Sequence, residues 1–208
     1  GLFAGLSLVT ALRASVGTIT EYGDSLATLK AVAVSATVPL EHQEEVFGRL
    51  SAKARELGAS TRYTASQSAE GLLFLARAGF SVSEQLAAIG STLDLATVGM
   101  LSLGEAADIA SNIVSQFGLG AENTERVVDS LTNTSNRTNT SVRQLADAMV
   151  FAGPVAAALG QELEVTSAAL GVLGDQGIQG SMAGTNLRMI MLSLIKPTAD
   201  AEKAIIDL

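Results

Sequence analysis

Few side chains in this sequence could take part in chemistry, and none of them stands in a recognisable catalytic or metal-binding pattern. His42 is the only histidine, and the chain has no cysteine. Thiol nucleophiles and cysteine-type zinc sites are therefore excluded, and a triad or metal site at His42 has no identifiable partners. The acids of residues 41–45 suit an exposed first helical turn, where the helix dipole favours negative charge. We expect no catalytic residue, no metal site and no cofactor.

Carboxylates offer one further candidate. Asp175 could pair with Asp147 or Glu164 in general acid–base chemistry, but no spacing in the sequence fixes the distance between them. We interpret these acids as exposed residues near helix ends, and we expect that the chain is not an enzyme.

A cluster of glycines between residues 170 and 198 is the most distinctive local pattern. A nucleotide loop is disfavoured, because no G-x-G-x-x-G follows a strand and no lysine lies between Ala168 and Ile195. Each glycine in a helix interior costs about 1 kcal/mol relative to alanine. Tight turns or close backbone approach between helices must therefore explain them. The glycines are Gly171, Gly174, Gly177, Gly180 and Gly184.

Arg188 is the one charged residue in the apolar run 187–192. Its planar set of donors could bind the carbonyls of a neighbouring helix, or reach solvent or a partner protein. We predict that Arg188 and the five glycines form a helix-packing or partner-contact surface.

Composition points to closely packed helices. The 208 residues are 48% hydrophobic but only 4% aromatic, with no Trp, so burial must come from Ala, Leu, Val and Ile. The formal net charge of −8 argues against binding through phosphate neutralisation, so we expect no sequence-specific nucleic-acid binding.

Helix start signals recur along the chain. A capping box, in which a Ser or Thr precedes a Glu or Gln by three residues, occurs with Thr64, Ser81, Ser102 and Ser141 as its first residue. Glycine stops are predicted at Gly79, Gly99, Gly118 with Gly120, and Gly153-Pro154. We interpret the polar segment 132–141 as a solvated loop that ends at the Ser141 cap.

The pattern predicts an all-α fold, an array or bundle of about eight to ten short helices. The sequence 30–38 is strand-like in isolation but is interpreted as helix or linker. Expected helices cover residues 3–35, 39–57, 66–78, 82–97, 103–117, 121–132, 141–152, 163–175, 181–195 and 198–208.

A weak internal repeat is also present. The segments that begin at Ser66 and Arg143 align at an offset of 77 residues. Half of this offset suggests helical-hairpin repeats of about 38 residues, a usual length for such units. We expect residues 1–38 to form a helical lead-in that continues a longer N-terminal part. Residues 39–208 are expected to form the core domain.

The ordered set of motifs over residues 40–208 resembles the core region of phage tail tape measure proteins, of the siphophage, myophage and prophage type. Its strongest part is Gly-Ile-Gln-Gly-Ser-Met-Ala-Gly-Thr-Asn-Leu-Arg, from Gly177 to Arg188. The other matching segments are residues 57–71, 75–80, 93–96, 107–112, 117–119, 128–131 and 168–173.

This resemblance implies a structural virion protein that occupies the tail-tube lumen, supports tail assembly and length determination, and is ejected with the DNA. It implies bacterial cytoplasm as the location during assembly. Implied partners are other copies of the chain as a trimer or hexamer, tail-tube and tail-tip or hub proteins, and assembly chaperones. Contact with the host membrane during infection is a further option.

An alternative hypothesis is a membrane-active module. In that hypothesis the apolar segments Leu2–Ile19 and Met149–Gly160 insert into the host envelope during genome ejection. Both segments are short or interrupted for a span of about 20 apolar residues.

Overall fold

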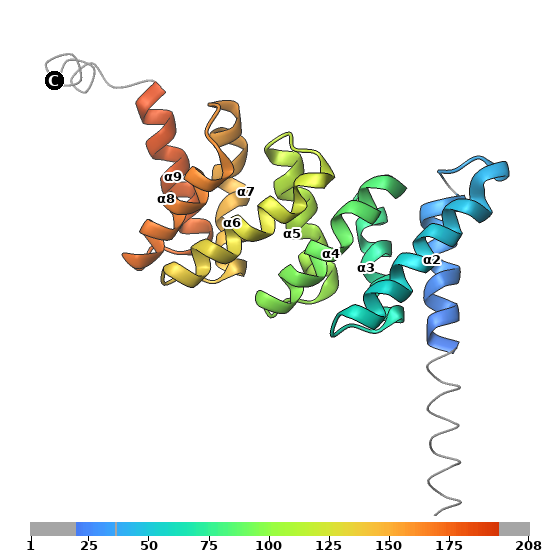
Figure 1. Cartoon of the computed structure of the whole chain (residues 1–208). Helices are drawn as coiled ribbons and strands as arrows, with labels where there is room; N and C mark the ends of the chain where they lie inside the picture. The colour runs from blue at the N-terminus through green and yellow to red at the C-terminus, as the bar shows by residue number, and fades with distance from the viewer. Residues whose placement is uncertain (1–19, 36, 196–208) are drawn as a thin grey trace, which may run out of the picture. The chain divides into compact units, whose positions relative to one another are not determined.

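The computed structural model describes residues 20–35 and 37–195, and all regular structure within them is helical. Residues 20–29 form a helix that continues into a π-helical segment, Lys30–Ser35. Short 3₁₀ turns lie at Leu40–His42 and Ala121–Asn123. The described part of the chain also forms α2 (Gln43–Ser60), α3 (Ala65–Arg77), α4 (Val82–Val98), α5 (Leu103–Gln116), α6 (Thr124–Arg137), α7 (Val142–Ala158), α8 (Leu163–Asp175) and α9 (Gly180–Ile195) (Figure 1).

The predicted all-α class is confirmed for these residues. The segment 30–38, strand-like in sequence, is π-helix as far as Ser35, in agreement with the interpretation as helix or linker. The expected helix 198–208 and residues 3–19 of the expected lead-in lie outside the described residues.

The predicted capping residues begin the helices. The Thr64 and Ser141 hydroxyls each accept a hydrogen bond from the third residue of the helix, whose glutamine side chain accepts from the capping N–H in return. Ser81 and Glu84 make the same reciprocal pair, with the Ser81 N–H donating to Glu84 Oε2 at 2.7 Å. The Ser102 hydroxyl accepts from the Glu105 N–H at 3.3 Å. These bonds satisfy backbone donors that lack an intrahelical partner.

The predicted helix stop at Gly153-Pro154 is wrong. The helix α7 continues through both residues to Ala158, and the left-handed glycine that follows it is Gly160, with φ +69°. Pro154 removes the donor that would bond the Val150 carbonyl, but Pro154 and Val150 are both exposed, so water can bind that carbonyl. A proline on the solvent side of a helix therefore does not end it here.

The interpretation of residues 132–141 as a loop is also wrong in its first half. The helix α6 extends to Arg137, and only residues 138–141 form the turn. Thr134 and Thr138 lie close to the Gly171 backbone of α8. Tertiary packing of Thr134, the one of the two that lies within α6, outweighs its weak helix propensity.

The chain divides into two compact units, each with its own core. The first comprises the described residues up to Leu93 together with Ser102–Asp108, and the second comprises Asp94–Leu101 and the described residues from Ile109 on. Fully buried side chains of the first unit include Leu29, Leu50, Leu72, Leu75 and Ile89. Those of the second include Ile113, Leu131, Leu145, Met149 and Leu163.

The helices repeat at a regular spacing, which confirms the predicted period. Four successive helix pairs, α2–α3, α4–α5, α6–α7 and α8–α9, have second members that begin at Ala65, Leu103, Val142 and Gly180, at spacings of 38, 39 and 38 residues. The fifth residue of each second helix is small and buried: Ala69, Ala107, Ala146 and Gly184.

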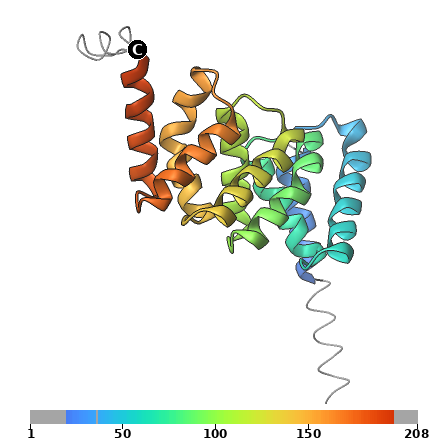
Figure 2. The ribbon, with the colours of Figure 1, turned by 60° about the vertical axis from the view of Figure 1, so that its left-hand side comes forward.

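Within the second unit the two helix pairs α6–α7 and α8–α9 stack in register. The helix α8 packs on both α6 and α7, and α9 packs on α7 and α8 (Figure 2). Residues that meet across this stack are about one repeat apart in sequence, as in the buried bond from the Ser130 hydroxyl to the Ser167 hydroxyl at 2.8 Å. The repeat in sequence is therefore also a repeat of contacts.

The caps give the first prediction. Thr64→Ala and Ser141→Ala should each lower the free energy of unfolding by about 1 kcal/mol, because each leaves a backbone donor at a helix start without its acceptor. Ser193→Ala, at an exposed site near the end of α9, is the control and should leave stability unchanged. Denaturant unfolding followed by circular dichroism measures all three. Equal midpoints for the cap variants and the control would contradict the prediction.

Candidate helix junction and partner surface

Three of the five predicted glycines lie where another backbone or side chain comes close. A Cβ on Gly171 would lie 2.7 Å from Thr134 Cγ2, and a Cβ on Gly174 would lie 3.0 Å from Thr140 Cβ. A Cβ on Gly184 would lie 2.8 Å from Ala148 C and Cα, and closer still to the Ala148 carbonyl oxygen. At Gly184 the obstacle is backbone, which cannot rotate away as a side chain can. The helix α9 therefore meets α7 at a distance that only glycine permits.

The other two glycines shape the turn between α8 and α9. Gly177 has φ +79° and Gly180 has φ +57°, and no atom lies within 4 Å of a Cβ built on either. Past Gly177 the chain reverses, and the Ile178 N–H donates to the Leu173 carbonyl at 3.0 Å, the pattern that closes a helix at a left-handed glycine. Glycine is needed at these two positions because the backbone is left-handed there, and not because a Cβ would collide with a neighbour.

Arg188 is exposed on α9. The structure thus places the six predicted residues on α8, α9 and the turn between them, but on different surfaces. Whether they form a contact for a partner protein stays a prediction.

A set of polar contacts joins the α8–α9 turn to the α6–α7 turn. The Asn139 N–H donates to Asp175 Oδ1 at 2.7 Å, and the Gln179 side-chain amide donates to the Asn139 carbonyl. The Gln144 amide donates to Gln179 Oε1 at 2.8 Å. Sequence reasoning missed this cluster because the partners are 35 to 40 residues apart, and only the repeat spacing could have indicated them.

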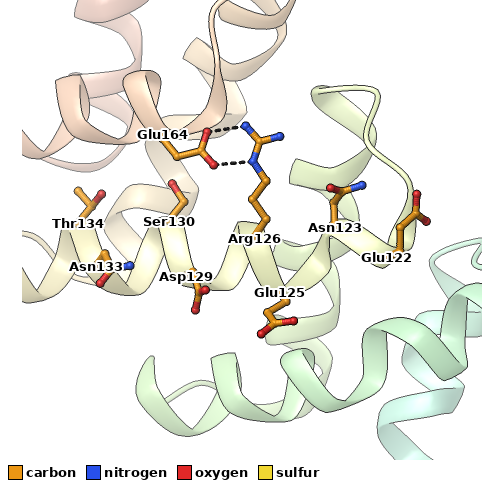
Figure 3. Close-up of a pocket in the computed structure, with 9 residues that line it drawn as sticks. All are labelled: Glu122, Asn123, Glu125, Arg126, Asp129, Ser130, Asn133, Thr134 and Glu164. Atoms are coloured by element: carbon orange, nitrogen blue, oxygen red, sulfur yellow. Dashed lines mark hydrogen bonds and ion pairs between the residues drawn. The ribbon is translucent and has the colours of Figure 1, made fainter.

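A polar hollow lies along α6 and α8, with an ion pair at its centre (Figure 3). Arg126 Nε donates to Glu164 Oε1 at 2.5 Å and its Nη2 donates to Glu164 Oε2 at 2.7 Å, a bidentate geometry. These bonds lower the pKa of the Glu164 carboxyl and raise the pKa of Arg126. The pair therefore stabilises the fold at pH values above the ordinary pKa of Glu164, and this stabilisation is lost as the pH falls through the lowered pKa. Solvent screening keeps the effect small, since both side chains are more than 40% exposed.

The candidate acids thus have separate structural roles. Asp175 binds a backbone N–H, Glu164 binds Arg126, and Asp147 is exposed. His42 is exposed at the start of α2. In the part of the chain that the structure describes, no three His, Asp or Glu side chains are grouped so that they could hold a metal ion.

An apolar groove lies between α8 and α9. Exposed hydrophobic side chains gather there, with Val165 54% exposed, Ile190 49% and Leu194 67%. The residues that line the groove are Leu159, Gln161, Val165, Thr166, Ala169, Leu187, Ile190, Met191, Leu194 and Ile195.

The membrane hypothesis rested on two segments. Leu2–Ile19 lies outside the described residues. Met149–Gly160 belongs mostly to α7, and its residues Met149, Ala152 and Ala156 are fully buried in the second unit. Over the described ranges, no individual helix has the length and apolar character to cross a bilayer, while the bent pair α4 and α5 meets those two criteria jointly.

The packing at Gly184 gives the second prediction. Gly184→Ala should destabilise the second unit, because a methyl group at this site displaces the Ala148 backbone and separates α9 from α7. Overpacking of this kind costs about 1–3 kcal/mol. Gly180→Ala should cost less, since only the left-handed backbone is strained there, by about 1–2 kcal/mol.

Gly48→Ala is the matched control. Gly48 lies inside α2, is exposed, and has no atom within 4 Å of the position that a Cβ would take. Alanine should therefore raise stability by about 0.5–1 kcal/mol. Thermal and denaturant unfolding of the three variants measures the order of their stabilities. A Gly184→Ala protein as stable as the Gly48→Ala protein would refute the packing argument.

Comparison with known proteins gives the family. The family described as phage-related minor tail protein matches residues 51–208. The chain is 36% identical over 164 residues to the tape measure protein of Pneumococcus phage Dp-1, an alignment that covers 79% of this chain and 14% of that protein. It is 31% identical over 175 residues to the probable tape measure protein of Escherichia phage P2, which covers 84% of this chain and 22% of that protein.

The chain therefore spans less than a quarter of the length of these curated relatives. No solved structure matches it significantly. The resemblance that the motifs of residues 40–208 indicated is confirmed by the match over residues 51–208. The chain belongs to the family of phage-related minor tail proteins.

Proposed function

We propose that this chain is a structural section of a tape measure protein, which occupies the phage tail tube, supports tail assembly and length determination, and leaves the tail with the DNA. The observation that carries the proposal is the family match over residues 51–208, together with two relatives named as tape measure proteins. The stacked helix pairs are consistent with a structural role.

The charge and the contacts of the chain support this role. A net charge of −8 disfavours binding to DNA, so an acidic chain can share a confined space with DNA and be released with it. The buried side chains of both units, and the ion pair of Arg126 with Glu164, hold helices together rather than surround a substrate. We propose on this basis that the chain has no enzymatic activity.

The proposed partners are other copies of the chain, as a trimer or hexamer, the tail-tube and tail-tip or hub proteins, and assembly chaperones. The proposed location is the lumen of the tail tube in the virion and the bacterial cytoplasm during assembly. The division at residue 38 into a lead-in and a core domain stays a prediction.

A phage that carries the parent gene tests the assembly role. Gly184→Leu should reduce the yield of tailed particles, because a leucine cannot fit against the Ala148 backbone and the stack of α9 on α7 is lost. Gly48→Leu, on the exposed side of α2 with no atom near, should yield normal tails. Electron microscopy of lysates counts tailed and tailless particles. The stability of the purified Gly184→Leu chain is measured alongside. If this chain is destabilised and the phage still forms normal tails, the proposed assembly role is contradicted.

Removal of one helix pair tests length determination. Deletion of residues 119–160 removes α6 and α7 and joins Gly118 directly to Gln161, so that one left-handed glycine replaces another, since Gly118 and Gly160 have φ +61° and +69°. We expect shorter tails. A stacked helix pair spans about 10 Å, whereas the 42 deleted residues would span about 63 Å as one continuous helix.

A shortening of about 10 Å would indicate that the helix pairs are stacked in the tail. A shortening of about 63 Å would indicate that this region is a continuous helix there. Mean tail length from many particles is the measurement, with the Gly48→Ala phage as control. If the mean length of assembled tails is unchanged, residues 119–160 do not contribute to tail length.

A further inference from the structure

On its α9 side, the apolar groove occupies positions that are covered in the preceding helix pair. Leu187, Ile190, Met191 and Leu194 of α9 correspond, one repeat earlier, to residues of α7. Those equivalents are all buried: Met149, Ala152, Gly153 and Ala156. In α9, by contrast, Ile190 is 49% exposed and Leu194 is 67% exposed. The same positions of the repeat are thus buried in α7, while in α9 they include exposed side chains.

The stacking in the second unit indicates what would cover such a groove. The helix α8 is the first member of its pair, and it packs on both helices of the pair before it, α6 and α7. A first helix of a further pair would therefore lie against both α8 and α9. The groove is lined by residues of these two helices, Val165 and Ala169 on one side and Ile190 and Leu194 on the other.

The sequence after α9 carries the side-chain pattern of a first helix. In α6 the buried positions include Thr124, Val127, Val128 and Leu131, and one repeat later in α8 they are Leu163, Thr166, Ser167 and Leu170. At the same positions of the next repeat stand Ala201, Ala204, Ile205 and Leu208, which are all apolar.

One polar position follows the same period. Glu125, Glu164 and Glu202 stand one repeat apart, and each precedes the leucine of its segment by the same interval, as Glu202 precedes Leu208. Asp200 and Lys203 fall outside the apolar set. The segment 198–208 therefore has an apolar stripe at the spacing of one helix face.

We propose that residues 198–208 form the first helix of a further repeat and lie in the apolar groove between α8 and α9, with Ala201, Ala204, Ile205 and Leu208 facing the groove. The inference depends on the repeat register and not on the role in the tail. It identifies a segment of this chain, rather than a second copy, as the occupant of the groove.

Disulfide formation tests the proposal directly, since the chain has no cysteine. Ser130 and Ser167, whose hydroxyls are 2.8 Å apart, mark a close contact between α6 and α8. Their equivalents one repeat later are Ala169, which lines the groove, and Ile205. The double variant Ala169→Cys with Ile205→Cys should form an intramolecular disulfide under mild oxidation at low protein concentration, seen by mass and by mobility on a non-reducing gel.

The matched control is Ala169→Cys with Lys203→Cys. Residue 203 is two positions from residue 205, which places it on the opposite side of a helix that turns about 100° per residue. We expect at least a tenfold slower disulfide formation in this control. Equal rates in the two variants would overturn the proposal, and so would a disulfide between two chains, which would identify a second copy as the occupant.

A second measurement covers the case in which the substitutions disturb the fold. In the unaltered chain, the amides of residues 201–208 should exchange hydrogen at least tenfold more slowly than in a free peptide of the same sequence. Exchange at the rate of the free peptide would overturn the proposal.

Discussion

Close approach of helices through small residues is the constraint on which the rest of this structure depends. With 4% aromatic residues and no Trp, the chain buries little area with aromatic side chains and depends on aliphatic ones. It also gains contact by shortening the distance between backbones. Small buried residues recur at the same position of each repeat: Ala69, Ala107, Ala146 and Gly184. At Gly184 the backbones of two helices meet directly, since the Ala148 backbone leaves no room for a Cβ.

Polar contacts then fix the register that close packing alone would leave open. Helix surfaces rich in Ala and Gly have few protruding side chains, so a shift of one helix along another costs little free energy. The bonds of Asn139 to Asp175 and Gln179, and of Ser130 to Ser167, join residues one repeat apart and hold α8 and α9 at one position against α6 and α7. The Arg126–Glu164 pair adds a contact that salt and acid weaken.

Short sequence motifs predict much of this fold. Contacts between residues far apart in the sequence, which form most of the candidate site, are not visible in such motifs. Helix starts at Thr64 and Ser141 were predictable because a capping box is complete within four residues. The continuation of α7 past Pro154 was not, since it depends on which side of the helix meets solvent. Thr134 of α6 and Thr138 after it lie close to Gly171, a residue more than 30 positions away, which no local pattern shows. The division of the glycine cluster into packing glycines and turn glycines depends on contacts and backbone angles that the sequence does not show.

The contact at Asn139 has a consequence for sequence change. Asp175 and Gln179 bind the main-chain N–H and carbonyl of Asn139, while the residue itself is exposed. Any amino acid that keeps an N–H can supply the same two groups. Substitution of residue 139 therefore keeps these bonds, whereas substitution of Asp175 or Gln179 removes one of them. Within the α6–α7 turn, the side chain at position 139 can therefore vary while the contacts that join the two turns are kept.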